Sequence, residues 1–202
     1  LKGRKKKEMR VGGDMRRSLR KDTEIEKIGE KREKEKAKRA VEAGLSGKKV
    51  GRTMKCKEAT GSISRLDDME IAPFLISSSV ILACAQRLVR RICPSCKEPV
   101  TYPAKMFQDL GIDPKMFDGV TLHRGRGCER CKNSGYSGRA AIIEVMTVTD
   151  EIRKMVIKRV SASEIGKVAI AEGMRTLRMV AIDKARDGLS TLEQVLVMTS
   201  AH

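Results

Sequence analysis

The sequence predicts an α/β protein with a tetracysteine zinc module and a C-terminal helical domain. Three observations support this fold class: two Cys-x-x-Cys pairs, a β-type run at residues 140–146, and apolar residues at helical spacing on both sides of the cysteines. At 202 residues, the chain is long enough for one or two domains.

The two cysteine pairs read CPSC and CERC, and their candidate metal ligands are Cys93, Cys96, Cys128 and Cys131. Thiolates prefer zinc or iron, and four thiolates around zinc make a closed structural site. Two disulfides, or four unligated thiols, are the alternatives. We expect zinc because the sequence shows no signal peptide and cytosolic thiols stay reduced. A closed site has no open position for a substrate, so we expect a structural role.

Charge and composition restrict the partners of the chain. A formal net charge of +17 predicts an anionic partner such as nucleic acid, a nucleotide or lipid headgroups. Aromatic residues make up only 2% of the chain, and this argues against single-stranded nucleic acid, whose bases stack on aromatic rings. The longest mostly apolar stretch, residues 71–85, contains Pro73 and three serines, so it suits a buried helix better than a membrane span.

Three helices are expected before the first cysteine pair. Residues 33–43 carry alanine and valine at helical spacing and are followed by Gly44, a common helix stop. Residues 58–69 show a second apolar stripe. Pro73 suits the first turn of a third helix, which we expect to run as far as Arg91.

A strand and then four helices are expected after the second cysteine pair. The strand covers residues 140–146, and Asp150 opens the first helix. Ser163 suits the cap of the second helix, and the run Ser190-Thr-Leu-Glu193 forms a capping box for the last. We expect these helices to pack on one another through apolar residues at helical spacing, namely Ile152, Val156, Leu177, Val180 and Leu196.

Several motifs together resemble one family, the secretion ATPases of type II secretion and type IV pilus assembly. The matching runs are GSISRLDDM at 61–69, APFLISSSV at 72–80, AQRLVRRICPSCKEP at 85–99, GCERCKNSGYSGR at 127–139, GMRTLR at 173–178 and GLSTLEQVL at 188–196. The tetracysteine module resembles that of the pilus-extension and type II secretion members of the family.

The resemblance implies a fold and a set of domain boundaries. Residues 1–91 correspond to the second half of a RecA-like P-loop ATPase domain. Residues 92–138 form the inserted zinc module, residues 139–149 return to the RecA-like sheet, and residues 150–202 form the C-terminal helical domain.

The first 57 residues match the family less closely but in register. The resemblance assigns Glu30 to the acidic Walker B position, which helps to polarise water or hold magnesium, and Arg32 to the arginine that follows it. It also places two parallel strands near residues 24–27 and 50–52. Such strands are buried on both faces in the family, whereas charged residues occur at both places here. Either this half packs differently from the family, or these residues are altered or wrongly read.

No G-x-x-x-x-G-K-[ST] phosphate loop occurs in the sequence, so we expect no ATP hydrolysis by this chain alone. The resemblance implies ATP and magnesium as cofactors of the full-length family, a homo-hexamer, and inner-membrane platform and adaptor proteins as partners. It further implies a cytoplasmic location, with membrane association only through those partners. A basic zinc-ribbon module that binds nucleic acid is the alternative function.

Overall fold

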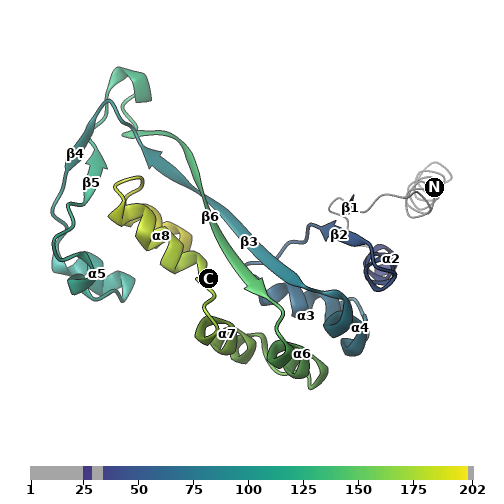
Figure 1. Ribbon diagram of the computed structural model, residues 1–202. Helices are drawn as coiled ribbons and strands as arrows, with labels where there is room; N and C mark the ends of the chain where they lie inside the picture. Colours follow the sequence, from purple (N-terminus) through teal and green to yellow (C-terminus); the bar gives the residue numbers. More distant parts are fainter. Residues whose placement is uncertain (1–24, 29–33, 200–202) are drawn as a thin grey trace. The chain divides into compact units, whose positions relative to one another are not determined.

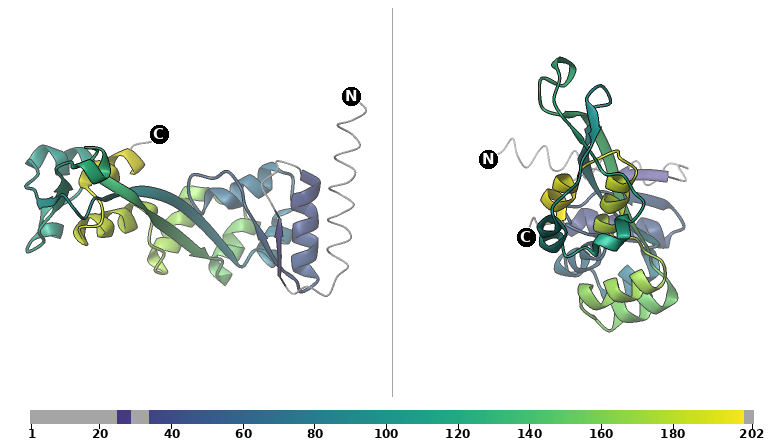
Figure 2. Two further views of the ribbon diagram at one scale, coloured as in Figure 1. Left: turned by 90° about the horizontal axis from the view of Figure 1, so that it is seen from above. Right: turned by 90° about the vertical axis from the view of Figure 1, so that its left-hand side faces the viewer.

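The computed structural model describes residues 25–28 and 34–199. Its contacts divide the chain into two compact units, Leu1–Ala83 with Met146–Glu172 and Cys84–Val145 with Gly173–His202. Neither unit is continuous in sequence. Two long strands, β3 (Leu82–Ile92) and β6 (Tyr136–Thr147), each contribute residues to both units. Figures 1 and 2 show these strands side by side, and they are hydrogen-bonded to each other.

The described part of the first unit contains a β–α–β segment followed by further helices. Its elements are β1 (Ile25–Ile28), α2 (Lys34–Leu45), β2 (Lys49–Arg52), α3 (Gly61–Asp68), α4 (Pro73–Ser79), α6 (Asp150–Ile157) and α7 (Ala162–Ala171). Strands β1 and β2 are parallel, with Ile25 opposite Lys49, and they lie where the family resemblance places strands. The residues of β2 alternate between exposed and half-buried, so Lys49 is exposed and Arg52 is half-buried.

The helices of the first unit pack through the apolar faces that their spacing predicts. Helix α4 contacts α2, α3 and α6, and α7 contacts α3 and α6. The buried apolar residues of these helices include Ala37, Val41, Ile63, Leu66, Ile76, Ile152, Val156, Ile165 and Ala169. None of the helices in the described residues has the length and apolarity needed to cross a bilayer.

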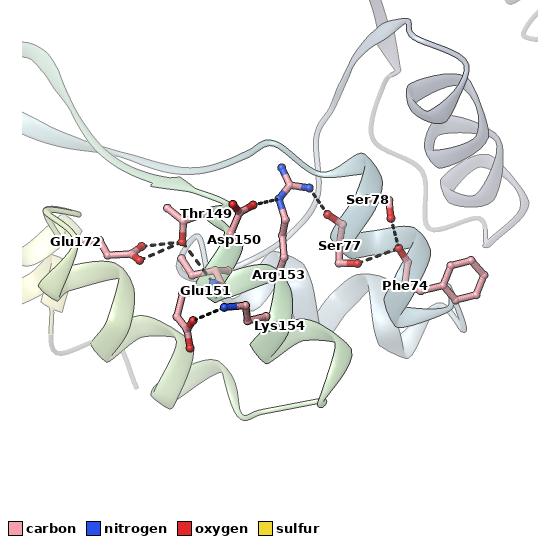
Figure 3. A network of polar contacts seen from close by, with 10 residues as sticks. Phe74, Ser77, Ser78, Thr149, Asp150, Glu151, Arg153, Lys154 and Glu172 are labelled. Carbon is pink, nitrogen blue, oxygen red and sulfur yellow. Dashed lines mark hydrogen bonds and ion pairs between the residues drawn. The ribbon is translucent and has the colours of Figure 1, made fainter.

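Polar contacts hold helix α6 to α4 and to the end of α7, as Figure 3 shows. The guanidinium of Arg153 in α6 donates to the backbone carbonyl of Ser77, near the C-terminus of α4, and lies 3.6 Å from an Asp150 carboxylate oxygen. A carbonyl in the last turn of a helix lacks an intrahelical donor, so an arginine there satisfies it. The Thr149 hydroxyl caps α6 by accepting from the Ile152 N–H and donates to Glu172 just after α7.

The expected helix from Pro73 to Arg91 is wrong beyond Ser79. Helix α4 ends there, and residues from Leu82 onward form strand β3. The segment contains Ala, Leu, Gln and Arg, which favour helices. A short apolar run is also compatible with both the helical period of about 3.6 residues and the strand period of about 2. Burial alternates along β3, with Ala83, Ala85 and Val89 on the inner side, and pairing with β6 overrides the local preference for a helix.

The second unit surrounds one hydrophobic core. Besides β3 and β6, its elements are β4 (Lys97–Pro99), α5 (Ala104–Leu110), η1 (Pro114–Phe117), β5 (His123–Gly125), η2 (Glu129–Cys131), α8 (Leu177–Arg186) and α9 (Leu192–Thr199). Strands β4 and β5 are antiparallel, with Lys97 opposite Gly125. The core joins the strands to α5, α8 and α9 through residues such as Val89, Phe107, Ile142, Ile182 and Leu192.

The structure distributes the C-terminal helices differently from the expected single helical domain. Helices α6 and α7 belong to the first unit, whereas α8 and α9 belong to the second. Ile152 and Val156 are buried in the first unit. Leu177, Val180 and Leu196 pack against the core of the second unit. The helices therefore pack on one another in two separate pairs, α6 with α7 and α8 with α9.

Hydroxyl caps begin these helices, at positions close to the expected ones. Ser161, rather than Ser163, accepts from the Glu164 N–H at the start of α7. At α9 the Thr191 hydroxyl accepts from the Gln194 N–H, while the Ser190 hydroxyl donates to the Arg90 carbonyl of β3. The hydroxyl cap therefore lies at Thr191, one residue after the predicted Ser190, and both Ser190 and the Gln194 side chain instead bond to the backbone of Arg90.

We predict that Ile142→Ala lowers the free energy of unfolding by about 2–5 kcal/mol, because Ile142 is fully buried in the second core. Ile143→Ala is the matched control: this neighbour on β6 is 46% exposed, so its loss should cost about 1 kcal/mol or less. Urea unfolding followed by circular dichroism measures both changes. Equal effects of the two substitutions would contradict this assignment of the buried face.

Candidate metal centre

The structure brings the four predicted cysteines together. Cys93 and Cys96 lie between β3 and β4, and Cys128 and Cys131 lie at the η2 turn before β6. One sulfur atom from each residue lies within 4.8 Å of the other three. Residues separated by the long β4–α5–β5 insertion therefore meet at a single point.

The distances between the sulfur atoms suit a shared metal ion. Cys93 Sγ lies 3.9 Å from Cys128 Sγ, Cys96 Sγ lies 3.9 Å from Cys131 Sγ, and the two sulfurs of the second pair are 3.7 Å apart. A tetrahedron with zinc–sulfur bonds of about 2.3 Å places its sulfurs about 3.8 Å apart. A disulfide needs about 2.05 Å. The four thiols therefore fit a closed tetrahedral site.

Backbone N–H groups surround the sulfurs. The Gly127 N–H donates to Cys96 Sγ at 3.3 Å, and Cys131 Sγ accepts from the Cys128 and Gly135 N–H groups at 3.2 and 3.3 Å. Such bonds orient ligands and stabilise the negative charge of a metal-bound thiolate. The turns thus supply both the ligands and part of their surroundings.

Close contact between two glycines makes this arrangement possible. A Cβ atom on Gly125 would lie 2.0 Å from the Gly135 carbonyl oxygen, so the two backbones touch where β5 passes the start of β6. Gly135 has a φ of +75°, and its carbonyl accepts from the Cys93 N–H at 3.0 Å. Only glycine fits at Gly125, and the contact brings the two cysteine pairs together. The sequence shows glycines near the second pair, but not that two of them touch.

The surroundings affect the four thiols differently. Burial raises the pKa of Cys96 to about 12, and the neighbouring thiols add to this increase. Burial also opposes ionisation of Cys131, but hydrogen bonds from the Cys128 and Gly135 N–H groups and from the neighbouring thiols outweigh it and lower the pKa to about 6. The surroundings therefore favour the thiolate form of Cys131 and oppose that of Cys96.

The predicted catalytic residues Glu30 and Arg32 lie outside the described residues.

The cysteine module is also supported by an arginine to which the sequence analysis gave no role there. Arg90 of β3 lies over the Tyr136 ring, with its guanidinium carbon 4.1 Å from the ring centroid. The Tyr136 hydroxyl is 2.9 Å from the Thr191 hydroxyl at the start of α9. These contacts attach the base of the module to the second core.

A sequence model of the family described as "Type II/IV secretion system protein" matches residues 3–197, and the chain belongs to this family. It is 43% identical over 185 residues to the type IV pilus assembly ATPase PilB of Thermus thermophilus. It is 38% identical over 196 residues to the type II secretion system ATPase E of Vibrio cholerae. The resemblance seen in the sequence motifs is confirmed.

The chain spans only part of these relatives. The matches cover 92% and 95% of this chain, but only 21% of the Thermus protein and 38% of the Vibrio protein.

Solved structures show the same fold. The X-ray structure of the Legionella pneumophila ATPase DotB aligns with a TM-score of 0.60 at 15% identity, covering 93% of this chain and 41% of that one. DotB of Yersinia pseudotuberculosis aligns with a TM-score of 0.55 at 19% identity, covering 91% of this chain and 39% of that one. The mixed helix and strand arrangement thus matches the fold of the aligned part of the DotB structures.

We predict that Gly125→Ala lowers the zinc content of the purified chain, because its Cβ would overlap the Gly135 carbonyl and separate the two cysteine pairs. Ser95→Ala is the control: Ser95 lies in the turn of the first pair, is exposed, and its hydroxyl accepts from Arg130. Elemental analysis of both variants compares their zinc content. Full zinc occupancy in Gly125→Ala would show that the glycine contact is not required.

We also predict one zinc per chain, lost in Cys96→Ser and retained in Cys56→Ser, since Cys56 lies outside the cluster. Because metal-bound thiolates must be deprotonated, acid should release the ion as protons compete for the sulfurs. Elemental analysis after dialysis at decreasing pH tests both points. A chain purified without chelator that contains no zinc would exclude this site.

Proposed function

We propose that this chain is the C-terminal part of an ATPase that couples ATP hydrolysis to type IV pilus assembly or type II protein secretion. The observation that carries the proposal is the four-thiol cluster within a chain that belongs to the secretion family over residues 3–197. The curated relatives are pilus-assembly and secretion ATPases, which supports the same general role.

The proposed metal is a structural zinc held by Cys93, Cys96, Cys128 and Cys131. Bound zinc would supply a fixed tetrahedral cross-link and, with four protein ligands, no open position for a substrate. The cysteine turns hold the start and the end of the insertion together, so that β3 and β6 enter the second core in register. The two pairs therefore act on the shape of the chain rather than on a reaction.

For catalysis, we assign Glu30 to the Walker B position and Arg32 to the arginine that follows it, on the basis of the family motif. The Glu30 carboxylate would orient the attacking water or hold magnesium beside ATP. Phosphoryl transfer depends on positioning and on neutralising the phosphate charges. A longer polypeptide, as in the relatives, would have to supply the phosphate-binding loop that this sequence lacks.

The proposed assembly is a homo-hexameric ring on the cytoplasmic side of the inner membrane. Its partners would be the platform and adaptor proteins of a pilus or secretion system. The names of the relatives, which place them in such systems, support this part of the proposal.

Nucleic-acid binding is less well supported. Among the described aromatic residues, Phe107, Phe117 and Tyr102 are buried, and Tyr136 lies under Arg90. Phe74 is 61% exposed, but a row of stacked bases needs several exposed rings. Affinity for nucleic acid that falls steeply with salt would revive this alternative.

We predict that Glu30→Gln in the full-length parent lowers the rate of ATP hydrolysis by about 10²–10³ or more while leaving nucleotide binding intact, because the side chain keeps its size and loses its charge. Glu24→Gln is the control, since Glu24 is not at the Walker B position of the motif. Phosphate release and fluorescent nucleotide binding measure the two effects. We expect no phosphate release from the 202-residue chain alone, and full activity of the Glu30 variant would refute the Walker B assignment.

A further inference from the structure

The four thiols of the metal centre differ in their exposure. Cys93, Cys96 and Cys131 are 1%, 8% and 7% exposed, whereas Cys128 is half-buried. A reagent in solution therefore reaches Cys128 more easily than the other three. Oxidation of a thiol needs such access as well as an electron-rich sulfur.

The same four sulfurs differ in their hydrogen bonds. Cys131 accepts two backbone N–H groups and Cys96 accepts one. The Cys128 sulfur also accepts one backbone N–H, from Cys131 at the other end of the η2 turn. An N–H donor draws electron density from a sulfur lone pair and makes it a weaker nucleophile. Within the second pair, Cys128 therefore has the better access and accepts one backbone N–H, whereas Cys131 is buried and accepts two.

A partner for Cys128 lies in the same turn. Cys131 Sγ is 3.7 Å away, and the Cys131 N–H donates to the Cys128 carbonyl at 3.1 Å, which closes the turn. Residues at the two ends of such a turn have Cα atoms less than about 7 Å apart, within the range that a disulfide can bridge. Cys93 Sγ is 3.9 Å away, but it belongs to the other cysteine pair. The shortest route to a disulfide is therefore within the second pair.

We propose that Cys128 is an oxidation site of the metal centre, at which hydrogen peroxide converts the Cys128 and Cys131 thiolates into a disulfide. The proposal rests on the structural zinc site proposed above. The Cys128 sulfur attacks one peroxide oxygen, the O–O bond breaks, and the departing hydroxide takes up a proton to leave as water. The Cys131 sulfur then attacks the Cys128 sulfenic acid, forming the S–S bond and breaking the S–O bond. Its hydroxide also leaves as water, so the two sulfurs lose two electrons and the peroxide gains them.

Oxidation would remove half of the ligand set. Cys93 and Cys96 would remain as thiolates, and two ligands cannot hold zinc in a closed site. The chain would therefore release its metal as the disulfide forms. A dithiol reductant would reduce the disulfide and restore all four thiols. Oxidation of the second cysteine pair would therefore open the metal module reversibly.

The test uses the full 202-residue chain carrying Cys56→Ser and Cys84→Ser, so that only the four clustered thiols can react. The zinc-loaded chain is treated with less than one equivalent of hydrogen peroxide. The remaining thiols are then blocked with N-ethylmaleimide, and peptide mass spectrometry locates the disulfide. A zinc-sensitive dye records metal release in the same sample. We expect a Cys128–Cys131 disulfide as the first product, with one zinc released for each disulfide formed.

A first disulfide between Cys93 and Cys96, or equal oxidation of both pairs, would overturn the proposal. Resistance of the cluster to a peroxide dose that oxidises exposed Cys84 in the unsubstituted chain would also overturn it. The experiment distinguishes failure of the zinc assignment from failure of this proposal. A chain that purifies without zinc would refute the zinc assignment, while the order in which the thiols are oxidised would still test the selectivity for Cys128.

Discussion

The hydrogen bonds between β3 and β6 determine where the inserted metal module leaves the core and where it returns. The strands run antiparallel, and bonds close to both ends of the pair, from Cys93 to Gly135 and from Val148 to Ile81, fix their alignment. Cys93 therefore lies next to the segment that carries Cys131. The buried sides of both strands, through Val89 and Ile142, also support α8 and α9 in the second core. A change in this pairing would displace the thiols and the core together.

A small number of contacts close the cysteine module and attach it to the second core. Gly125 and Gly135 bring the cysteine turns together, while Arg90 and Tyr136 attach the base of the module to α9. Four thiolates around a divalent cation carry a net charge of −2 when the metal is bound, and the N–H groups around them offset part of that charge. These N–H groups are shared unequally: Cys131 accepts two, whereas Cys96 and Cys128 accept one each.

The sequence was most informative where the chemistry is local. The spacing of the two cysteine pairs predicts their cluster, because each pair needs only one turn, and the motifs around them identify the family. The sequence failed where distant pairing decides the structure. Residues 82–91 favour a helix by composition and become a strand because β6, many residues later, pairs with them. Ser190 looks like a helix cap, yet it bonds to Arg90, which no local pattern could reveal.

The division of the chain has a consequence for synthesis. The segment Cys84–Val145 interrupts the first unit, whose later part, Met146–Glu172, supplies helices α6 and α7. During synthesis, the contact between Arg153 of α6 and the Ser77 carbonyl of α4 cannot form until the whole cysteine module has left the ribosome. The second unit cannot be completed until its later part, Gly173–His202, has been synthesised. Neither unit can be completed before the other has begun, so both should fold late and close together in time, and no single truncation yields either unit without part of the other.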